Sequence, residues 1–218
     1  MNLALWVLIV LLSGYLIGCL HGSHVAQRLS GVNVKEQGIK NAGATNATIV
    51  LGKKYGALVA LIDIGKSILA IGLLRLLLGS TALSFETQWV LLFLMGAFVV
   101  IGHNYPFQMH FDGGKGTASV IGVMLVLDWK IGLAGLLLMI VIALVTDYLL
   151  IGVLFLYITF FVLAFWVTDS NSTLPIAITI ALFLLALWKH RENIQRLKDG
   201  TEPRVSSVIK KKKAVSTQ

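Results

Sequence analysis

Three polar segments of the chain carry the residue types that hold phosphate groups. They are "GVNVKEQGIKNAGATNAT" (residues 31–48), "GHNYPFQMHFDGGKGTAS" (102–119) and "KHRENIQRLKDGTEPR" (189–204). Each mixes glycine with basic and amide side chains. Glycine lets backbone N–H groups approach a ligand, lysine supplies a point charge, and amides orient further donors. If the fold brings these segments together, they predict a site for an anionic ligand.

The second segment has the clearest pattern of the three. Gly113, Gly114 and Gly116 allow close backbone approach, Lys115 supplies charge, and Thr117 opens a helix whose N-terminal dipole favours an anion. It is not a nucleotide-binding P-loop, because that pattern requires glycine at position 109, where this chain has methionine. The alternative is a flexible membrane-surface turn with a snorkelling lysine.

In the third segment, His190 and Asn193 fall on one face of a helix that continues the last apolar run. This spacing indicates an acid–base or phosphate-contacting pair. An interfacial helix end, whose basic residues meet backbone carbonyls and lipid headgroups, is the competing interpretation. The five histidines show no metal-ligand spacing such as HExxH, so no metal site is predicted.

The elements that must position these segments are membrane helices. The chain has 218 residues, of which 57% are hydrophobic and only 13% charged, and its mean hydropathy is +0.86. These values are typical of polytopic membrane proteins. The single cysteine, Cys19, has no intrachain partner, which excludes a disulfide framework.

The apolar runs predict an all-α protein with about seven transmembrane helices. The fourth run is short, and a helix of about 11 residues crosses only about half of a ~30 Å bilayer core. We expect a single transmembrane domain at 1–204 and a basic tail at 205–218. The predicted helices are Leu3–Leu20, Tyr55–Leu78, Gln88–Ile101, Thr117–Leu127, Ile131–Thr146, Leu149–Val167 and Leu174–Trp188.

The basic residues predict the orientation of these helices. Fifteen of the 18 lysines and arginines lie in 28–54, 102–116 and the part after Trp188, all on one side of the predicted membrane. The positive-inside rule makes this side cytoplasmic, with the N-terminus outside and the C-terminus inside. The tail lysines are expected to meet anionic lipid headgroups, so no nucleic-acid partner is predicted. Asp63 and Lys66, three residues apart in the second run, are expected to pair inside the bundle with a structural role. A direct contact with a ligand is the alternative that the sequence leaves open.

Several motifs together resemble one known family. "NAGATN", "GKKYG" with Asp63 and Lys66, "GHNYPF" with "GGKGTA", and "KHRENIQRLKDGTE" are similar to motifs of the bacterial acyl-phosphate:glycerol-3-phosphate acyltransferases, from about Gly18 to Glu202. The resemblance implies seven helices in the bacterial inner membrane and chemistry on the cytoplasmic side. It also implies transfer of a fatty acyl group from acyl phosphate to the 1-hydroxyl of glycerol 3-phosphate, without a cofactor. The product is lysophosphatidic acid for phospholipid synthesis.

The resemblance also implies roles for individual residues. Lys115, His190 and Asn193 match positions that support catalysis, and Glu202, like Asp63 and Lys66, is expected to be structural. Lys40, beside the first motif, is expected to add positive charge for the substrate. The remaining expected substrate-binding residues are Asn41, Gly43, Thr45, Asn46, Gly113, Gly114, Gly116 and Thr117.

The first motif departs from the family pattern where the family has groups that contact phosphate. Ile39 stands where the family has serine, and Ile49 stands where it has arginine. An active enzyme would use direct attack by the glycerol hydroxyl, with the donor's own phosphate or His190 taking the proton. Two alternatives stay open: a non-catalytic relative that binds substrate or regulates lipid metabolism, and a transporter. A transporter would be expected to show repeated halves or broken mid-membrane helices, and neither is evident in the sequence.

Overall fold

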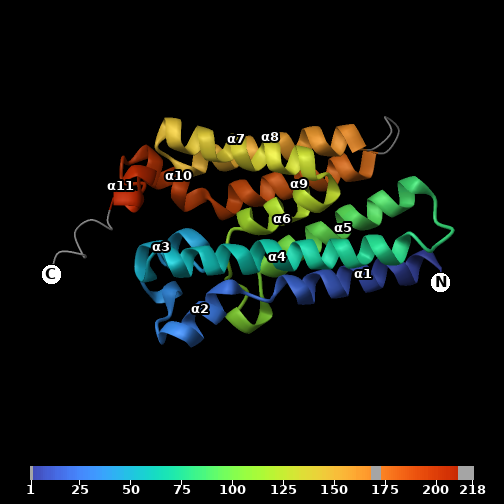
Figure 1. Cartoon of the computed structure of the whole chain (residues 1–218), viewed down its shortest axis with the longest axis horizontal. Coiled ribbons are helices and arrows are strands. Elements are labelled where there is room, and N and C mark those ends of the chain that lie inside the picture. The colour runs from blue at the N-terminus through green and yellow to red at the C-terminus, as the bar shows by residue number, and fades with distance from the viewer. Residues whose placement is uncertain (1, 168–172, 211–218) are drawn as a thin grey trace.

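The chain folds into a bundle of helices. The computed structural model describes residues 2–167 and 173–210, and these contain helices and turns but no strand (Figure 1). The helices are α1 (Leu3–Gly18), α2 (Gly22–Ser30), α3 (Ala44–Leu51), α4 (Lys53–Leu78), α5 (Phe85–Asn104), α6 (Thr117–Leu127), α7 (Trp129–Thr146), α8 (Leu149–Val167), α9 (Thr173–Lys189), α10 (Arg191–Lys198) and α11 (Val205–Lys210), with 3₁₀ turns at Val34–Glu36 and Phe107–Met109.

All seven predicted apolar helices are present. Five helical segments of the described chain are long and apolar enough to cross a membrane, and α9 with α10 makes a sixth if this bent pair is one span. The seventh, α6, is the short helix that its 11-residue run predicted. The all-α, multi-pass membrane architecture is therefore confirmed, since helices satisfy their own backbone groups in lipid.

The helical path of the chain breaks near the ends of the first and the last predicted spans. The first predicted span, Leu3–Leu20, ends as a helix at Gly18, and α2 begins at Gly22. The last span does not run straight into the third polar segment, because α9 and α10 meet at His190 with a bend of 53°. Neither break involves proline, so tertiary partners must satisfy the freed backbone groups.

Glycines let the long helices approach one another closely. A Cβ on Gly102 of α5 would lie 2.2 Å from the Tyr15 carbonyl oxygen of α1. A Cβ on Gly122 of α6 would lie 2.3 Å from the Ile64 carbonyl oxygen of α4. Small residues at such crossings are how membrane helices gain packing contact in the absence of a hydrophobic driving force. The short α6 is thereby held against α4 inside the bundle.

Helices α3, α10 and α11 gather at one end of the bundle, opposite the N-terminus (Figure 1). Asp147, in the α7–α8 turn, anchors α11: its carboxylate accepts from the backbone N–H and hydroxyl of Ser206, both at 2.7 Å. A carboxylate at a helix N-terminus also complements the helix dipole. Residues 211–218 of the expected basic tail lie outside the described residues, so the domain boundary at 204 stays a prediction.

Candidate active site

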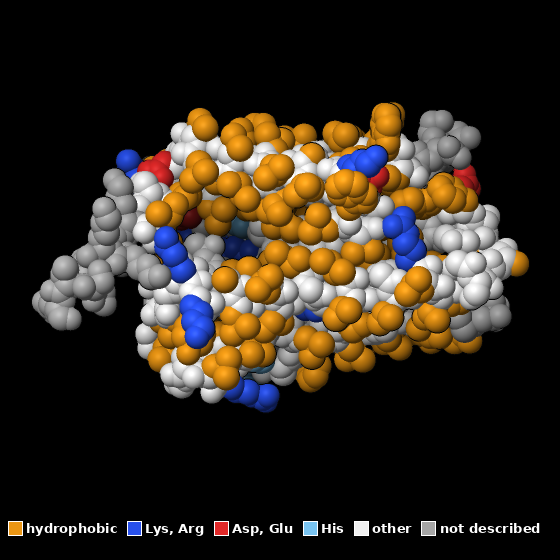
Figure 2. Space-filling view, viewed as in Figure 1, with side chains coloured by type: hydrophobic (Ala, Val, Ile, Leu, Met, Phe, Trp, Pro, Cys, Tyr) orange, Lys and Arg blue, Asp and Glu red, His pale blue; other side chains and the backbone are white. Residues whose placement is uncertain are grey.

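The three polar segments meet around one cavity of about 510 Å³. Figure 2 shows this face hollowed between two rims, with basic and histidine side chains at the bottom of the hollow. The polar part of the wall is made by Asn41, Gly43, Thr45, Asn46, Thr48, Asp63, His103, Lys115, Gly116, Thr117, His190, Asn193 and Glu202. The convergence predicted from the sequence is therefore observed.

Lys115 is held in the cavity wall by a chain of side-chain contacts. Its ammonium donates to the Asn193 amide oxygen. The Asn193 amide nitrogen in turn donates to one Glu202 carboxylate oxygen at 2.6 Å, and the other accepts from Arg196 at 2.8 Å. Glu202 thus fixes which end of the Asn193 amide faces Lys115.

His190 caps the start of α10 and is 6% exposed. Its Nδ1 lies 2.8 Å from the Ala186 carbonyl oxygen. A carbonyl can only accept, so Nδ1 carries the ring proton and Nε2 of the neutral ring has a free lone pair. The 53° bend at this residue brings His190 and Asn193 to the same cavity. His190 is therefore arranged to accept a proton or a hydrogen bond.

Two helices begin at the polar end of the cavity. Helix α3 starts after Gly43, and α6 starts after Gly116, whose φ of +84° is a left-handed conformation that suits glycine. The first N–H groups of a helix have no partner within it, and they carry the positive end of its dipole. Two such ends beside Lys115 make this part of the cavity suited to an anion.

The first polar segment is organised by Asn46, which is 1% exposed. Its amide nitrogen lies within hydrogen-bond distance of the carbonyl oxygens of Val34 (2.6 Å), Gln37 (3.0 Å) and Asn41 (2.9 Å), and its oxygen accepts from the Ile39 N–H at 2.9 Å. Both ends of this side chain are engaged with the loop. Asn46 thus shapes the site rather than presenting a free group to it.

Three residues expected to bind substrate lie outside the cavity wall. Lys40 is exposed, with a φ of +50°. Gly113 and Gly114 donate their N–H groups to the carbonyl oxygens of Asn104 and His103, each at 3.1 Å. These two glycines therefore fasten the loop to the end of α5. Of the three glycines in this loop, only Gly116 lines the cavity.

The other part of the wall is apolar. It is formed by Ala57, Ala60 and Ile64 of α4, Ile121 of α6, Leu136 and Met139 of α7, Leu149, Leu150 and Val153 of α8, and Val205, Val208 and Ile209 of α11. Sequence reasoning did not distinguish these residues from ordinary membrane-span residues. A cavity with a cationic end and an apolar arm suits an amphiphile that carries a phosphate and an alkyl chain.

Fold and site together define a multi-pass membrane protein built to handle a phosphate-bearing lipid or its precursor. The family model for glycerol-3-phosphate acyltransferase matches residues 8–200. The chain belongs to the glycerol-3-phosphate acyltransferase family.

Individual relatives agree along nearly the whole chain. It is 44% identical to glycerol-3-phosphate acyltransferase 1 of Oceanobacillus iheyensis, over 95% of this chain and 99% of that one. It is 35% identical to glycerol-3-phosphate acyltransferase 1 of Deinococcus radiodurans, over 95% and 100% of the two chains. Among solved structures, it resembles the integral membrane acyltransferase PlsY in its glycerol 3-phosphate form, with a TM-score of 0.79, 30% identity and coverage of 97% and 99%.

Proposed function

We propose that this protein transfers a fatty acyl group from acyl phosphate to the 1-hydroxyl of glycerol 3-phosphate, giving lysophosphatidic acid. The observation that carries the proposal is the single cavity that joins a cationic, amide-lined end to an apolar arm. The first suits the phosphates of both substrates, and the second suits the acyl chain. Its relatives named glycerol-3-phosphate acyltransferase support the same reaction.

In the proposed mechanism, the hydroxyl oxygen of glycerol 3-phosphate attacks the acyl carbonyl carbon of the donor. The bond between this carbon and the phosphate oxygen breaks, phosphate leaves with the electron pair, and the hydroxyl proton passes to the leaving phosphate or to His190 Nε2. Lys115 and the N-terminal amides of α3 and α6 hold negative charge, while Asn193 orients Lys115. Because acyl phosphate is already activated, holding both reactants in attack geometry supplies much of the rate, about 7–11 kcal/mol.

We further propose that the cavity opens toward the cytoplasm from the bacterial inner membrane. The support is the clustering of basic residues: fifteen of 18 lie on the side that carries the three polar segments. In this orientation the N-terminus is outside and the C-terminus is cytoplasmic, so water-soluble glycerol 3-phosphate reaches the polar end directly. The acyl donor and the product exchange with membrane lipids through the apolar arm.

The proposal is tested by one turnover assay. Purified protein in lipid vesicles is given palmitoyl phosphate and labelled glycerol 3-phosphate, and lysophosphatidic acid is measured. We expect product to form in proportion to protein and to depend on both substrates. If product stays at the background level while the protein still binds either substrate, the protein is a non-catalytic relative. This is the alternative suggested by Ile39 and Ile49 in place of serine and arginine.

The charge of Lys115 predicts how substrate affinity depends on pH. Burial, with the charge of Arg196 as a further cause, lowers the pKa of Lys115 to about 8. The ammonium is therefore charged below about pH 8 and neutral above it, whereas a phosphate monoester, with a second pKa of about 6, is a dianion on both sides. We expect the KM for glycerol 3-phosphate to be lowest near pH 7 and to rise as the pH passes through about 8.

The matched control for this prediction is Lys115→Arg, because a guanidinium keeps its charge across the whole range. The KM of the Lys115→Arg variant is expected to be higher than that of the wild type at pH 7, since the planar guanidinium differs in shape from an ammonium. It is expected to stay constant up to pH 9.5. A wild-type KM that is equally constant would contradict the assigned role of the Lys115 charge.

The apolar arm predicts discrimination by chain length. Ala60 lines it from α4, so Ala60→Phe would fill space that a long acyl chain needs. We expect kcat/KM for palmitoyl phosphate to fall about tenfold or more, because displaced methylenes lose about 0.8 kcal/mol each, while that for butyryl phosphate changes little. Leu61→Phe, on the exposed face of the same helix, is the control. An equal loss for both donors would place the acyl chain elsewhere.

A further inference from the structure

A second cluster of polar side chains lies buried beside the cavity, at the junction of the first span with α4 and α5. His21, Asp63, Lys66 and His103 are each at most 5% exposed. The proposed reaction uses none of these groups. Burying charged and polar groups inside a membrane protein costs free energy unless each group has a partner. Such clusters are therefore usually functional.

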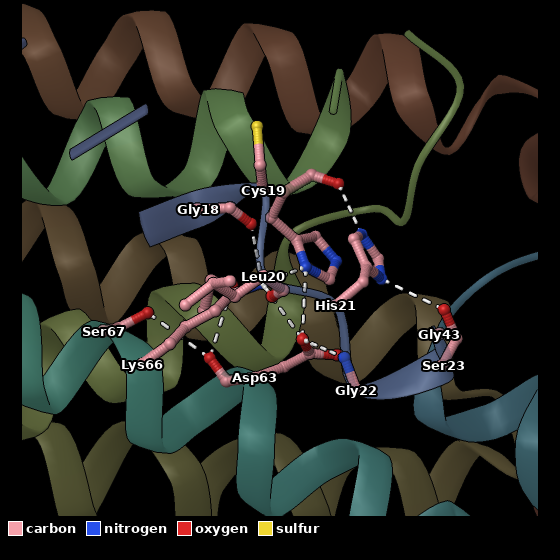
Figure 3. Close-up of polar contacts among 12 residues, drawn as sticks. Gly18, Cys19, Leu20, His21, Gly22, Ser23, Gly43, Asp63, Lys66 and Ser67 are labelled. Atoms are coloured by element: carbon pink, nitrogen blue, oxygen red, sulfur yellow. Dashed lines mark hydrogen bonds and ion pairs between the residues drawn. The ribbon is translucent and has the colours of Figure 1, made fainter. Parts of the chain in front are cut away.

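Asp63 and Lys66 bind the backbone groups that the break between α1 and α2 leaves free (Figure 3). The Lys66 ammonium donates to the carbonyl oxygens of Gly18 (2.9 Å) and Leu20 (2.6 Å), at the end of α1. Asp63 Oδ1 accepts from the N–H of Gly22, at the start of α2, at 3.2 Å. The cation thus meets the negative end of one helix and the anion meets the positive end of the next. The expected Asp63–Lys66 pair is present at 3.0 Å.

The same pair fixes the imidazole of His103. Lys66 Nζ lies 2.9 Å from His103 Nδ1. Asp63 Oδ1 lies 3.5 Å from the same nitrogen, so both members of the pair contact this side of the ring. His21 stacks on this ring with centroids 4.2 Å apart, and its Nε2 lies 2.9 Å from the His103 carbonyl oxygen. Side chain and backbone of His103 are both held in place.

From His103 the contacts lead directly to the loop that carries Lys115. The N–H of Gly114 donates to the His103 carbonyl oxygen at 3.1 Å. The imidazole lies against the same glycine so closely that a Cβ on Gly114 would be 2.1 Å from His103 Nε2. Lys115 is the next residue along the chain. A shift of His103 therefore moves the backbone from which Lys115 reaches Asn193.

We infer that His103, held by Asp63, Lys66 and His21, is a positioning residue that sets where Lys115 stands in the cavity. The inference rests on the proposed function, since it assigns the cluster to the same reaction. The break between α1 and α2 is then part of the site: its free backbone groups bind Lys66 and Asp63, which orient His103. Asp63 and His103 themselves reach the cavity wall, although no contact with the reacting atoms is assigned to them.

A double-mutant cycle tests the inference. We expect His103→Ala to lower kcat/KM by about tenfold or more, and Lys115→Ala to lower it further. If His103 acts through Lys115, the double variant will be no less active than Lys115→Ala alone, within about threefold. Two losses that multiply would overturn the inference, as would a His103→Ala variant with wild-type kcat/KM. Ser67→Ala, a buried change on the same face of α4, controls for general loosening of the bundle.

A milder variant keeps the test decisive if His103→Ala does not fold. His21→Phe keeps a ring stacked on His103 but removes the contact with its carbonyl oxygen, so a loss of a few-fold that also disappears in the Lys115→Ala background is expected. A loss that persists in that background would contradict the inference. If wild-type protein makes no product, the proposed function fails, and the same cycle is measured on glycerol 3-phosphate affinity instead.

Discussion

A Lys115→Ala variant in lipid vesicles is expected to lose about two orders of magnitude in kcat/KM. A hydrogen bond from a charged donor to phosphate contributes about 1.5–3 kcal/mol, and each 1.36 kcal/mol is tenfold in rate. Lys115 lines the same cavity as the first residues of α3 and α6, and its ammonium donates to Asn193. Its loss therefore removes charge where both phosphates are proposed to bind.

The matched control is Lys54→Ala. Lys54 is exposed at the start of α4, and it does not line the cavity. Its removal is expected to leave kcat/KM within about twofold, because surface charges contribute little at physiological salt. If Lys115→Ala keeps full activity while the protein stays folded, the proposed phosphate end of the cavity is wrong.

An Asn46→Ala variant is expected to lose both stability and activity. Asn46 bonds the Ile39 N–H and lies within hydrogen-bond distance of three carbonyl oxygens of the first loop. Each buried backbone group left without a partner costs about 1–3 kcal/mol, so the free energy of unfolding should fall by about 3 kcal/mol or more. The expected readouts are a lower Tm, faster proteolysis within residues 34–43 and weak turnover.

Asn33→Ala is the matched control, because it removes an asparagine of the same loop from a position that is only half-buried. Asn33 donates to Glu36 at 2.8 Å and accepts from the Lys35 N–H, near solvent that can replace both bonds. A loss below about 1 kcal/mol is expected. If Asn46→Ala is as mild as Asn33→Ala, the loop is held by other contacts than those assigned to Asn46.

Much of the architecture follows from the sequence because lipid imposes a strict rule on backbone hydrogen bonds. Long apolar runs must be helices, so α4, α7 and α8 were predicted within two residues of their ends. The convergence of Lys115, His190 and Asn193 also followed, because the distribution of basic residues placed their segments on one side. The short length of α6 was likewise evident from its run.

What the sequence did not reveal depends on contacts between distant helices. Lys66 and Asp63 of α4 bond the backbone groups that the break after Gly18 leaves free. The hydropathy of the sequence shows only a continuous apolar stretch there. Gly113 and Gly114 were assigned to substrate because glycine-rich loops bind phosphate, yet their N–H groups bond α5. Histidines next to apolar runs indicate that buried polar partners exist. The sequence does not identify the partners of His103, because they lie on other helices.

The most direct test of the account is a structure of the protein with lysophosphatidic acid bound. We predict that the product phosphate will lie within hydrogen-bond distance of Lys115, between the N-termini of α3 and α6. Its acyl chain should follow the apolar arm between α4 and the α7–α8 pair. A product bound with its phosphate away from Lys115, and with this cavity unfilled, would contradict the account.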